Sequence, residues 1–240
     1  MNLSKITNSV KRTYLYSTGF EKAYLVFINL IRITLIIAIV SSILSQNWWI
    51  LLTTILAFIM TFLPYIFEIS YKINLPLEFE ILTVVFIYAS MFLGTVNNYY
   101  EIFWWWDLLL HAGSAIALGL FGFTILYVLH RANRLNAKPF LIAIFAFSFA
   151  LAVGGLWEIF EFIIDQTLGW NMQGSGLRDT MGDLIVDSIG AFIASLLGYL
   201  YLKKRDFFIL GRVMKRFIKQ NPKLFEVENK DIDKKGKAKR

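Results

Sequence analysis

Eight ionisable residues interrupt stretches of this sequence that are otherwise apolar enough to cross a bilayer. They are Asp107, His111, Glu158, Glu161, Asp165, Asp179, Asp183 and Asp187. Carboxylate oxygens and imidazole nitrogens bind divalent cations and transfer protons in enzymes. Because ionisable groups are costly inside a membrane, they mark functional sites by default. The sequence therefore predicts a metal-binding or proton-transferring site in a membrane-embedded part of the chain.

The spacing of these residues predicts that they form three polar stripes, one on each of three helices. Asp107 and His111 are four residues apart, so they share one helical face. The carboxylates of the second segment stand at positions i, i+3 and i+7, and those of the third at i, i+4 and i+8. Each stripe would cost several kcal/mol if it faced lipid, so we expect the stripes to face one another or a wet cavity.

Small residues would allow the helices that carry these stripes to approach closely. Gly190, Ala194 and Gly198 are spaced four apart on the last apolar segment. Ala115, Gly119 and Gly122 supply small positions on an earlier one, a pattern typical of tightly packed membrane helices.

Seven carboxylates with Arg178 as the nearby fixed cation cannot all remain charged at low dielectric. Either several are protonated or a cation is bound. The expected metal ligands are Asp107, His111, Glu158, Glu161, Asp183 and Asp187. Oxygen-rich ligation with one histidine favours Mg²⁺, Mn²⁺ or Ca²⁺ over Zn²⁺ or Fe²⁺. We expect His111, Glu158 and Asp183 to be catalytic, and Arg178 and Asp179 to bind substrate.

Several of these residues also have purely structural interpretations. Asp179 is suited to cap a helix, and Thr180 with Asp183 resembles a capping box. Asp165 and Glu161 could end their helix at the lipid headgroups. Asp107 follows three tryptophans that resemble an interfacial aromatic belt, and a lone histidine is commonly a hydrogen-bonded core residue. The deepest residues are the hardest to explain in this way: His111, Glu158, Asp183 and Asp187.

Composition places the whole chain in the membrane class. Of its 240 residues, 57% are hydrophobic and only 17% are charged. This is too few charged residues to cover the surface of a water-soluble protein. The absence of cysteine excludes disulfides, thiolate metal sites and cysteine nucleophiles. The net charge of +7 lies largely in the C-terminal tail, so we attribute it to membrane topology and expect no nucleic-acid partner.

We predict an all-α polytopic membrane protein, a bundle of about six transmembrane helices with amphipathic N- and C-terminal segments. At about 20 residues per crossing, the expected spans are 23–44, 48–67, 80–96, 104–129, 140–165 and 179–202. A cytoplasmic interfacial segment over 1–22 precedes the transmembrane domain over 23–202. An amphipathic helix over 203–222 and a disordered basic tail over 223–240 follow it.

Lysine and arginine predict the orientation in the plasma membrane. They gather in the N-terminal segment, in the link between the second and third spans, in the link between the fourth and fifth spans, and in the C-terminal tail. Both termini are therefore expected to be cytoplasmic. The polar stripes then lie in the outer half of the bilayer. Arg32, inside the first span, is expected either to extend to the headgroups or to pair with Glu68, Glu78 or Glu80.

No P-loop, dinucleotide fingerprint or nucleophile elbow is present. The runs WWWDLLLH, WEIFEF and DTMGDLIVDSIGA, in this order, resemble the YjdF-like family of uncharacterised multi-span prokaryotic inner-membrane proteins over about residues 76–200. The matching positions are Asp107, His111, Glu158, Glu161, Asp179, Asp183, Gly190 and Ala191. The end of the last run also resembles VanZ-like membrane proteins. Neither resemblance implies an activity.

Three functions fit these features. The first is a metal-dependent hydrolase or transferase that acts on a lipid or lipid-linked substrate at the outer leaflet, with His111 or Glu158 as general base. The second is a cation- or proton-coupled transporter, although acidic residues are sparse in the inner half. The third is a non-catalytic membrane scaffold whose polar residues hold three helices together. Membrane lipids are the expected partners, and the oligomeric state is left open.

Overall fold

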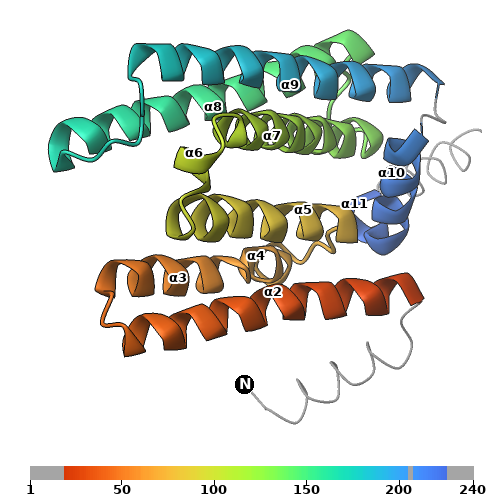
Figure 1. Ribbon diagram of the computed structural model, residues 1–240. Coiled ribbons are helices and arrows are strands. Elements are labelled where there is room, and N and C mark those ends of the chain that lie inside the picture. Colours follow the sequence, from red (N-terminus) through yellow and green to blue (C-terminus); the bar gives the residue numbers. More distant parts are fainter. Residues whose placement is uncertain (1–18, 205–207, 226–240) are drawn as a thin grey trace, which may run out of the picture. The chain divides into compact units, whose positions relative to one another are not determined.

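The computed structural model describes residues 19–204 and 208–225, and the regular structure in these ranges is entirely helical (Figure 1). Within these ranges, six helices are long and apolar enough to span a membrane: Lys22–Leu44, Trp48–Tyr71, Leu77–Val96, Trp106–Arg131, Pro139–Leu168 and Leu177–Lys204. They confirm the all-α prediction of six spans. The largest difference from the expected bounds is at Tyr71, four residues beyond the predicted end.

The expected interfacial segment over 1–22 falls mostly on residues 1–18, which lie outside the described ranges. The expected basic tail over 223–240 falls mostly on residues 226–240, which also lie outside them.

The chain forms two compact units, residues 1–98 and 99–240. Five elements make up the described part of the first: α2 (Gly19–Leu44), α3 (Trp48–Met60), α4 (Leu63–Tyr71), α5 (Leu77–Ile87) and the π-helix η1 (Tyr88–Val96). Their core is built around Ile28, Leu35, Ala57 and Val84. Long apolar side chains elsewhere on these helices are exposed, among them Ile37 on α2. An exposed apolar surface of this kind is what a lipid-facing helix requires.

Arg32 contacts a break in the second span. Its Nε donates to Thr61 Oγ1 at 3.2 Å and its terminal nitrogen donates to the Thr61 carbonyl at 3.1 Å. The guanidinium carbon also lies 4.1 Å from the centre of the Phe62 ring. These contacts lie between α3 and α4, where a carbonyl is freed from the helical ladder. Arg32 therefore donates hydrogen bonds to the backbone and side chain at this break in the helix. Within the described residues it forms no ion pair with Glu68, Glu78 or Glu80.

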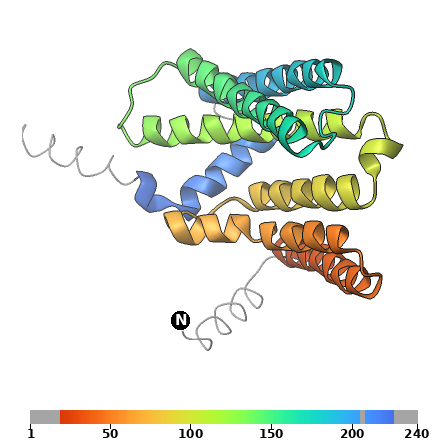
Figure 2. The same ribbon diagram turned by 90° about the vertical axis from the view of Figure 1, so that its left-hand side faces the viewer.

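The second unit contains three long helices, α7 (Trp106–Arg131), α8 (Pro139–Leu168) and α9 (Leu177–Lys204), packed together as a bundle (Figures 1 and 2). The short helix α6 (Tyr99–Ile102) precedes α7. α7 and α9 run in the same direction and α8 runs against them. Pro139 at the first turn begins α8, and Gly169 ends it with a φ of +68°, a left-handed conformation that favours glycine.

Small residues bring the three helices of this bundle into close contact, as the spacing predicted. A Cβ added at Gly119 would lie 2.6 Å from Ala194 Cβ on α9. A Cβ added at Gly190 would lie 2.9 Å from both the Ala112 carbonyl oxygen and Ala115 Cβ on α7. These approaches fix the height of α9 against α7, and with it the height of their polar stripes.

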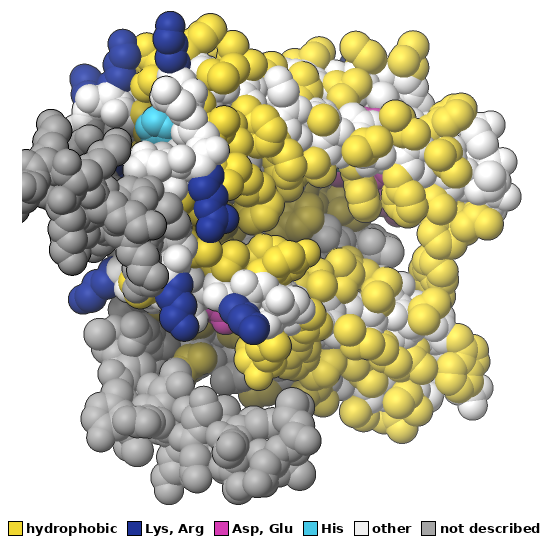
Figure 3. All heavy atoms as spheres, turned by 180° about the vertical axis from the view of Figure 1, so that it is seen from behind, with side chains coloured by type: hydrophobic (Ala, Val, Ile, Leu, Met, Phe, Trp, Pro, Cys, Tyr) yellow, Lys and Arg dark blue, Asp and Glu magenta, His cyan; other side chains and the backbone are white. Residues whose placement is uncertain are grey.

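Beyond α9, the chain forms α10 (Phe208–Gln220) and α11 (Pro222–Phe225). The amphipathic pattern predicted this helix on the inner leaflet. Its apolar residues Leu210, Val213, Met214 and Phe217 have little exposure. The place of this helix on the inner leaflet stays a prediction. Figure 3 shows Lys and Arg side chains gathered at one end of the face drawn, with hydrophobic side chains over most of the remainder.

Candidate functional site

The site is built around His111 of α7. The ring is buried, with 7% of the residue exposed. One turn earlier on the same helical face, Asp107 places Oδ1 3.9 Å from His111 Nε2. The Asp107 side chain is 33% exposed, because it lies in the first turn of α7. This pair is brought together by helical spacing alone, as predicted.

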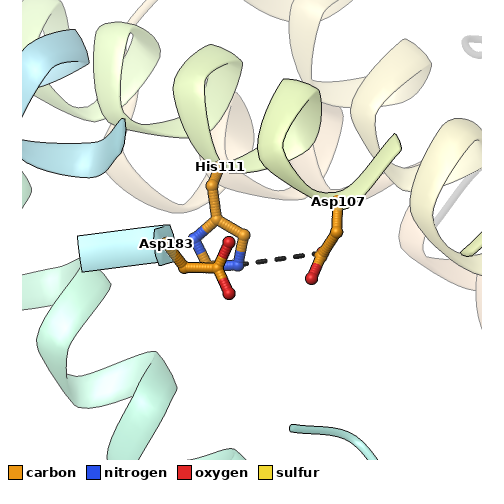
Figure 4. A group of neighbouring side chains, drawn as sticks. All are labelled: Asp107, His111 and Asp183. Atoms are coloured by element: carbon orange, nitrogen blue, oxygen red, sulfur yellow. Dashed lines mark ion pairs between the residues drawn. The ribbon is translucent and has the colours of Figure 1, made fainter. Parts of the chain in front are cut away.

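α9 contributes two further carboxylates, Asp183 and Asp187, which are 2% and 1% exposed. Asp187 Oδ1 lies 3.3 Å from His111 Nδ1, within hydrogen-bonding distance. Asp183 also lies close to the imidazole. One ligand atom from each of Asp107, His111 and Asp183 falls within 4.8 Å of the others, so this group could hold a metal ion. Figure 4 shows Asp107 and His111 extending from α7 toward Asp183 of α9.

α8 adds Glu158 and Glu161, both buried at 4% and 8% exposure. Glu158 Oε1 lies 3.8 Å from His111 Nε2. Neither Glu158 oxygen has a hydrogen-bond partner of ordinary geometry among the described residues. Glu161 Oε1 accepts a hydrogen bond of 2.9 Å from Trp157 Nε1. The two glutamates stand at i and i+3, so they share one face of α8.

We call these six residues the acidic cluster: Asp107, His111, Glu158, Glu161, Asp183 and Asp187. None of the described Lys or Arg side chains forms an ion pair with it. Asp183 Oδ2 and Asp187 Oδ2 are buried and also lack hydrogen-bond partners within the described residues. Buried carboxylate oxygens without donors are costly, so they indicate that a cation or shared protons complete the site.

A glycine on α8 makes room for the contact between His111 and Asp187. A Cβ added at Gly154 would overlap Asp187 Oδ2, whereas one at Gly155 would meet nothing within 4 Å. The absence of a side chain at Gly154 therefore lets α8 pack directly over the carboxylate. Sequence reasoning found the small residues of α7 and α9 but missed this one.

Asp165 lies apart from the acidic cluster, although it shares a predicted stripe with Glu158. Its two oxygens accept hydrogen bonds from the backbone N–H groups of Met172 and Gln173, at 2.7 and 2.9 Å. It therefore holds the loop that follows α8. The role in the loop was not predicted, and a position of Asp165 at the lipid headgroups stays a prediction.

The two residues predicted to bind substrate stand at the start of α9. Arg178 is exposed, and Asp179 is half-buried beside Gly174. The expected capping box does not form between Thr180 and Asp183, since Asp183 is buried in the acidic cluster. The Thr180 hydroxyl instead accepts a hydrogen bond of 2.7 Å from Gln173 Nε2 and lies beside Glu158.

Sequence reasoning also missed Trp157 as a member of the site. Trp157 supplies the donor to Glu161. The i, i+4 spacing of Trp157 and Glu161 was a signal available in the sequence.

Fold and site together define a polytopic helical membrane protein with a buried group of carboxylates around one histidine. The chain belongs to the family described as "Predicted membrane protein (DUF2238)", which matches residues 23–204 and includes the whole acidic cluster. An uncharacterized protein of Thermotoga maritima is 30% identical over 139 residues, which cover 58% of this chain and 70% of that protein. No solved structure matches the chain. The resemblances to YjdF-like and VanZ-like proteins stay sequence-based expectations.

Proposed function

We propose that the protein binds a divalent cation in the acidic cluster and uses it to hydrolyse, or to transfer a group from, a lipid or lipid-linked substrate. One observation carries the proposal: Asp107, His111 and Asp183 bring three ligand atoms within 4.8 Å of one another, while Asp187 contacts the opposite nitrogen of the same imidazole. Metal-ligating histidines commonly donate their second N–H to a carboxylate, which fixes the tautomer and directs the free nitrogen at the ion.

The types of ligand atom favour a hard ion. Oxygen-rich ligation with a single histidine supports Mg²⁺, Mn²⁺ or Ca²⁺ ahead of Zn²⁺ or Fe²⁺. Asp187 is assigned the orienting role rather than a place among the ligands, because it faces Nδ1.

Such an ion would polarise a phosphoryl or carbonyl oxygen and lower the pKa of a bound water. Glu158 is the better placed general base, because both His111 nitrogens already face carboxylates. The Thr180 hydroxyl is the neighbouring donor beside the Glu158 carboxylate, so a carboxylate oxygen is available to accept a proton. The exposed Arg178 would hold an anionic headgroup near the half-exposed Asp107.

The remainder of the bundle supports an enzyme over a transporter. From Ala112 to Leu129 on α7 no charged residue occurs, and none occurs from 140 to 157 on α8 or from 188 to 202 on α9. Phe123 fills this region with no exposure, and the hydroxyls of Tyr127 and Tyr201 lie 3.3 Å from each other. A path for ions through these helices would need polar groups along its length.

We also propose the plasma membrane as the location, with both termini cytoplasmic and the acidic cluster toward the outer leaflet. The basic residues Arg131, Lys138, Lys203 and Lys204 stand at the end of the bundle away from the acidic cluster, which supports this orientation. Membrane lipids are then the proposed partners, and a nucleic-acid partner is not.

The test is to purify the protein in detergent, measure bound metal by mass spectrometry, and assay release of phosphate or acyl groups from phospholipid and polyprenyl-phosphate substrates with Mg²⁺ or Mn²⁺. We expect wild-type protein to bind metal and turn over one substrate class, and Asp183→Asn to lose both. Glu101→Gln, which alters an exposed carboxylate on α6, is the matched control. Unchanged metal content and phenotype in a folded Asp183→Asn protein would favour the scaffold.

A further inference from the structure

The helix α10 carries its apolar and its charged residues on opposite faces. The apolar residues stand at positions i, i+3, i+4 and i+7 and have little exposure: Leu210, Val213, Met214 and Phe217. The cations of the other face stand at i, i+3 and i+7 and are exposed: Arg212, Lys215 and Lys219. Lys223 of α11 is exposed as well. We call these four cations the basic stripe, and we propose that it binds anionic phospholipid headgroups of the inner leaflet through charge, without insertion of apolar side chains.

The place of α10 in the chain puts the basic stripe at the level of the headgroups. The sixth span ends at Lys204, and α10 begins at Phe208. Four residues reach at most about 14 Å, and α10 contacts α9 while α11 contacts α7. Near the end of this span, Lys203 Nζ lies 5.0 Å from the centre of the Tyr199 ring, a pair typical of the membrane interface. Both short helices are therefore held beside the headgroups of the leaflet in which the sixth span ends.

The charge at this end of the second unit is of one sign. The ranges 112–157, 188–204 and 208–225 contain ten Lys and Arg residues and no Asp or Glu. The described carboxylates of the unit fall instead within 101–107, 158–165 and 179–187. The positive charge is thus not balanced within these three ranges. Anionic headgroups supply the complementary charge at the membrane surface, where each Lys or Arg strengthens binding about fivefold.

The apolar face of α10 distinguishes attraction by charge from insertion. A helix that inserts presents its apolar residues to the boundary of the acyl chains. Met214 has no exposure, and the Phe217 ring packs edge-on against Phe225 of α11 with ring centres 6.3 Å apart. These side chains are already covered, so the basic stripe is the part of the helix that meets the headgroups. Binding through exposed charges weakens as salt screens them, whereas insertion does not depend on salt in this way.

The test equilibrates full-length protein with detergent micelles that contain phosphatidylglycerol and phosphatidylcholine in equal amounts. The lipid that stays bound is counted by mass spectrometry at low and high ammonium acetate concentration. We expect the wild type to retain phosphatidylglycerol in preference, and the preference to decline at high salt. Replacement of the whole basic stripe by Gln should weaken retention of phosphatidylglycerol at least about tenfold. Thermal unfolding checks that this variant stays folded, as expected for substitutions at exposed positions.

Two control variants isolate the basic stripe and its charge. The first exchanges Lys for Arg and Arg for Lys within the stripe, which keeps every charge, and should behave as the wild type. The second removes four other exposed cations near this end of the unit and should keep most of the preference: Arg134→Gln, Lys138→Gln, Lys203→Gln and Lys204→Gln. An equal loss in this second control would overturn the assignment to the basic stripe, and a loss in the first would overturn charge as the cause.

The wild type decides the nature of the partner. Equal retention of the two lipids overturns the proposal and leaves an acidic protein as the occupant of the basic stripe. A preference that persists unchanged at high salt overturns binding through charge. The inference rests on the proposed membrane location and orientation but not on the metal. Asp183→Asn should therefore lose metal and keep the preference for phosphatidylglycerol, so that each proposal can fail without the other.

Discussion

His111 Nδ1 lies 3.3 Å from Asp187 Oδ1, although the two residues are 76 positions apart in the sequence. This contact joins α7 to α9 and leaves Nε2 facing Asp107 and Glu158, at 3.9 and 3.8 Å. The orientation of the imidazole therefore depends on a carboxylate that is not needed as a ligand.

Asp187→Asn tests that dependence. The substitution preserves the shape of the side chain and removes the charge that holds the Nδ1 proton. Loss of such an outer carboxylate typically costs about 10- to 100-fold in metal affinity, and we expect that loss in a Mn²⁺ titration of the purified protein. Ser188→Ala is the control, because the Ser188 hydroxyl donates to the Leu184 carbonyl of its own helix. Wild-type affinity in a folded Asp187→Asn protein would contradict the orienting role.

Gly154 and Gly155 form a matched pair on α8. Gly154→Ala places a methyl group against Asp187, so we expect overpacking to destabilise the protein by about 1–3 kcal/mol and to weaken metal binding. Gly155→Ala meets open space and should be neutral, or stabilising by up to about 1 kcal/mol. Thermal unfolding in detergent and Mn²⁺ titration of both variants provide the measurement. Equal effects at the two positions would show that α8 does not pack over Asp187.

Arg32→Met should destabilise the first unit without altering the metal site. The guanidinium makes two hydrogen bonds to Thr61, and loss of a charged donor costs about 1.5–3 kcal/mol per bond. All residues of the acidic cluster belong to the second unit, so metal content per folded chain should stay at the wild-type value. Lys22→Met, on the exposed surface of the same helix, is the control for thermal unfolding. Unchanged stability of Arg32→Met would refute the role assigned to this contact.

The absence of cysteine makes the proposed orientation directly measurable. Ser175→Cys lies in the exposed loop between α8 and α9, and Asn136→Cys lies in the exposed link between α7 and α8. With a membrane-impermeant maleimide, we expect labelling of Ser175→Cys in intact cells and of Asn136→Cys only after the membrane is opened. The reverse pattern would place the acidic cluster at the cytoplasmic side.

The six spans followed from the sequence because bilayer thickness sets a length of about 20 apolar residues. The three polar stripes followed from helical periodicity, which decides the residues that share a face. Their convergence was also expected, because hydrocarbon does not tolerate carboxylates singly. The break between α3 and α4 also has a signal in the sequence, because Pro64 in the first turn of α4 has no N–H to donate to the Met60 carbonyl. The contact of Arg32 with the Thr61 carbonyl, by contrast, was visible only in the structure.

The sequence by itself determined the class of protein, its helices and the residues that had to avoid lipid. Only the tertiary structure decided which atoms meet: Asp187 with Nδ1, Glu161 with Trp157, and Asp165 with the loop beyond α8. The physical reason is one of scale. Periodicity places a residue on a face, but a hydrogen bond is set within a few tenths of an ångström by the height and rotation of neighbouring helices, which close packing at Gly119, Gly154 and Gly190 fixes.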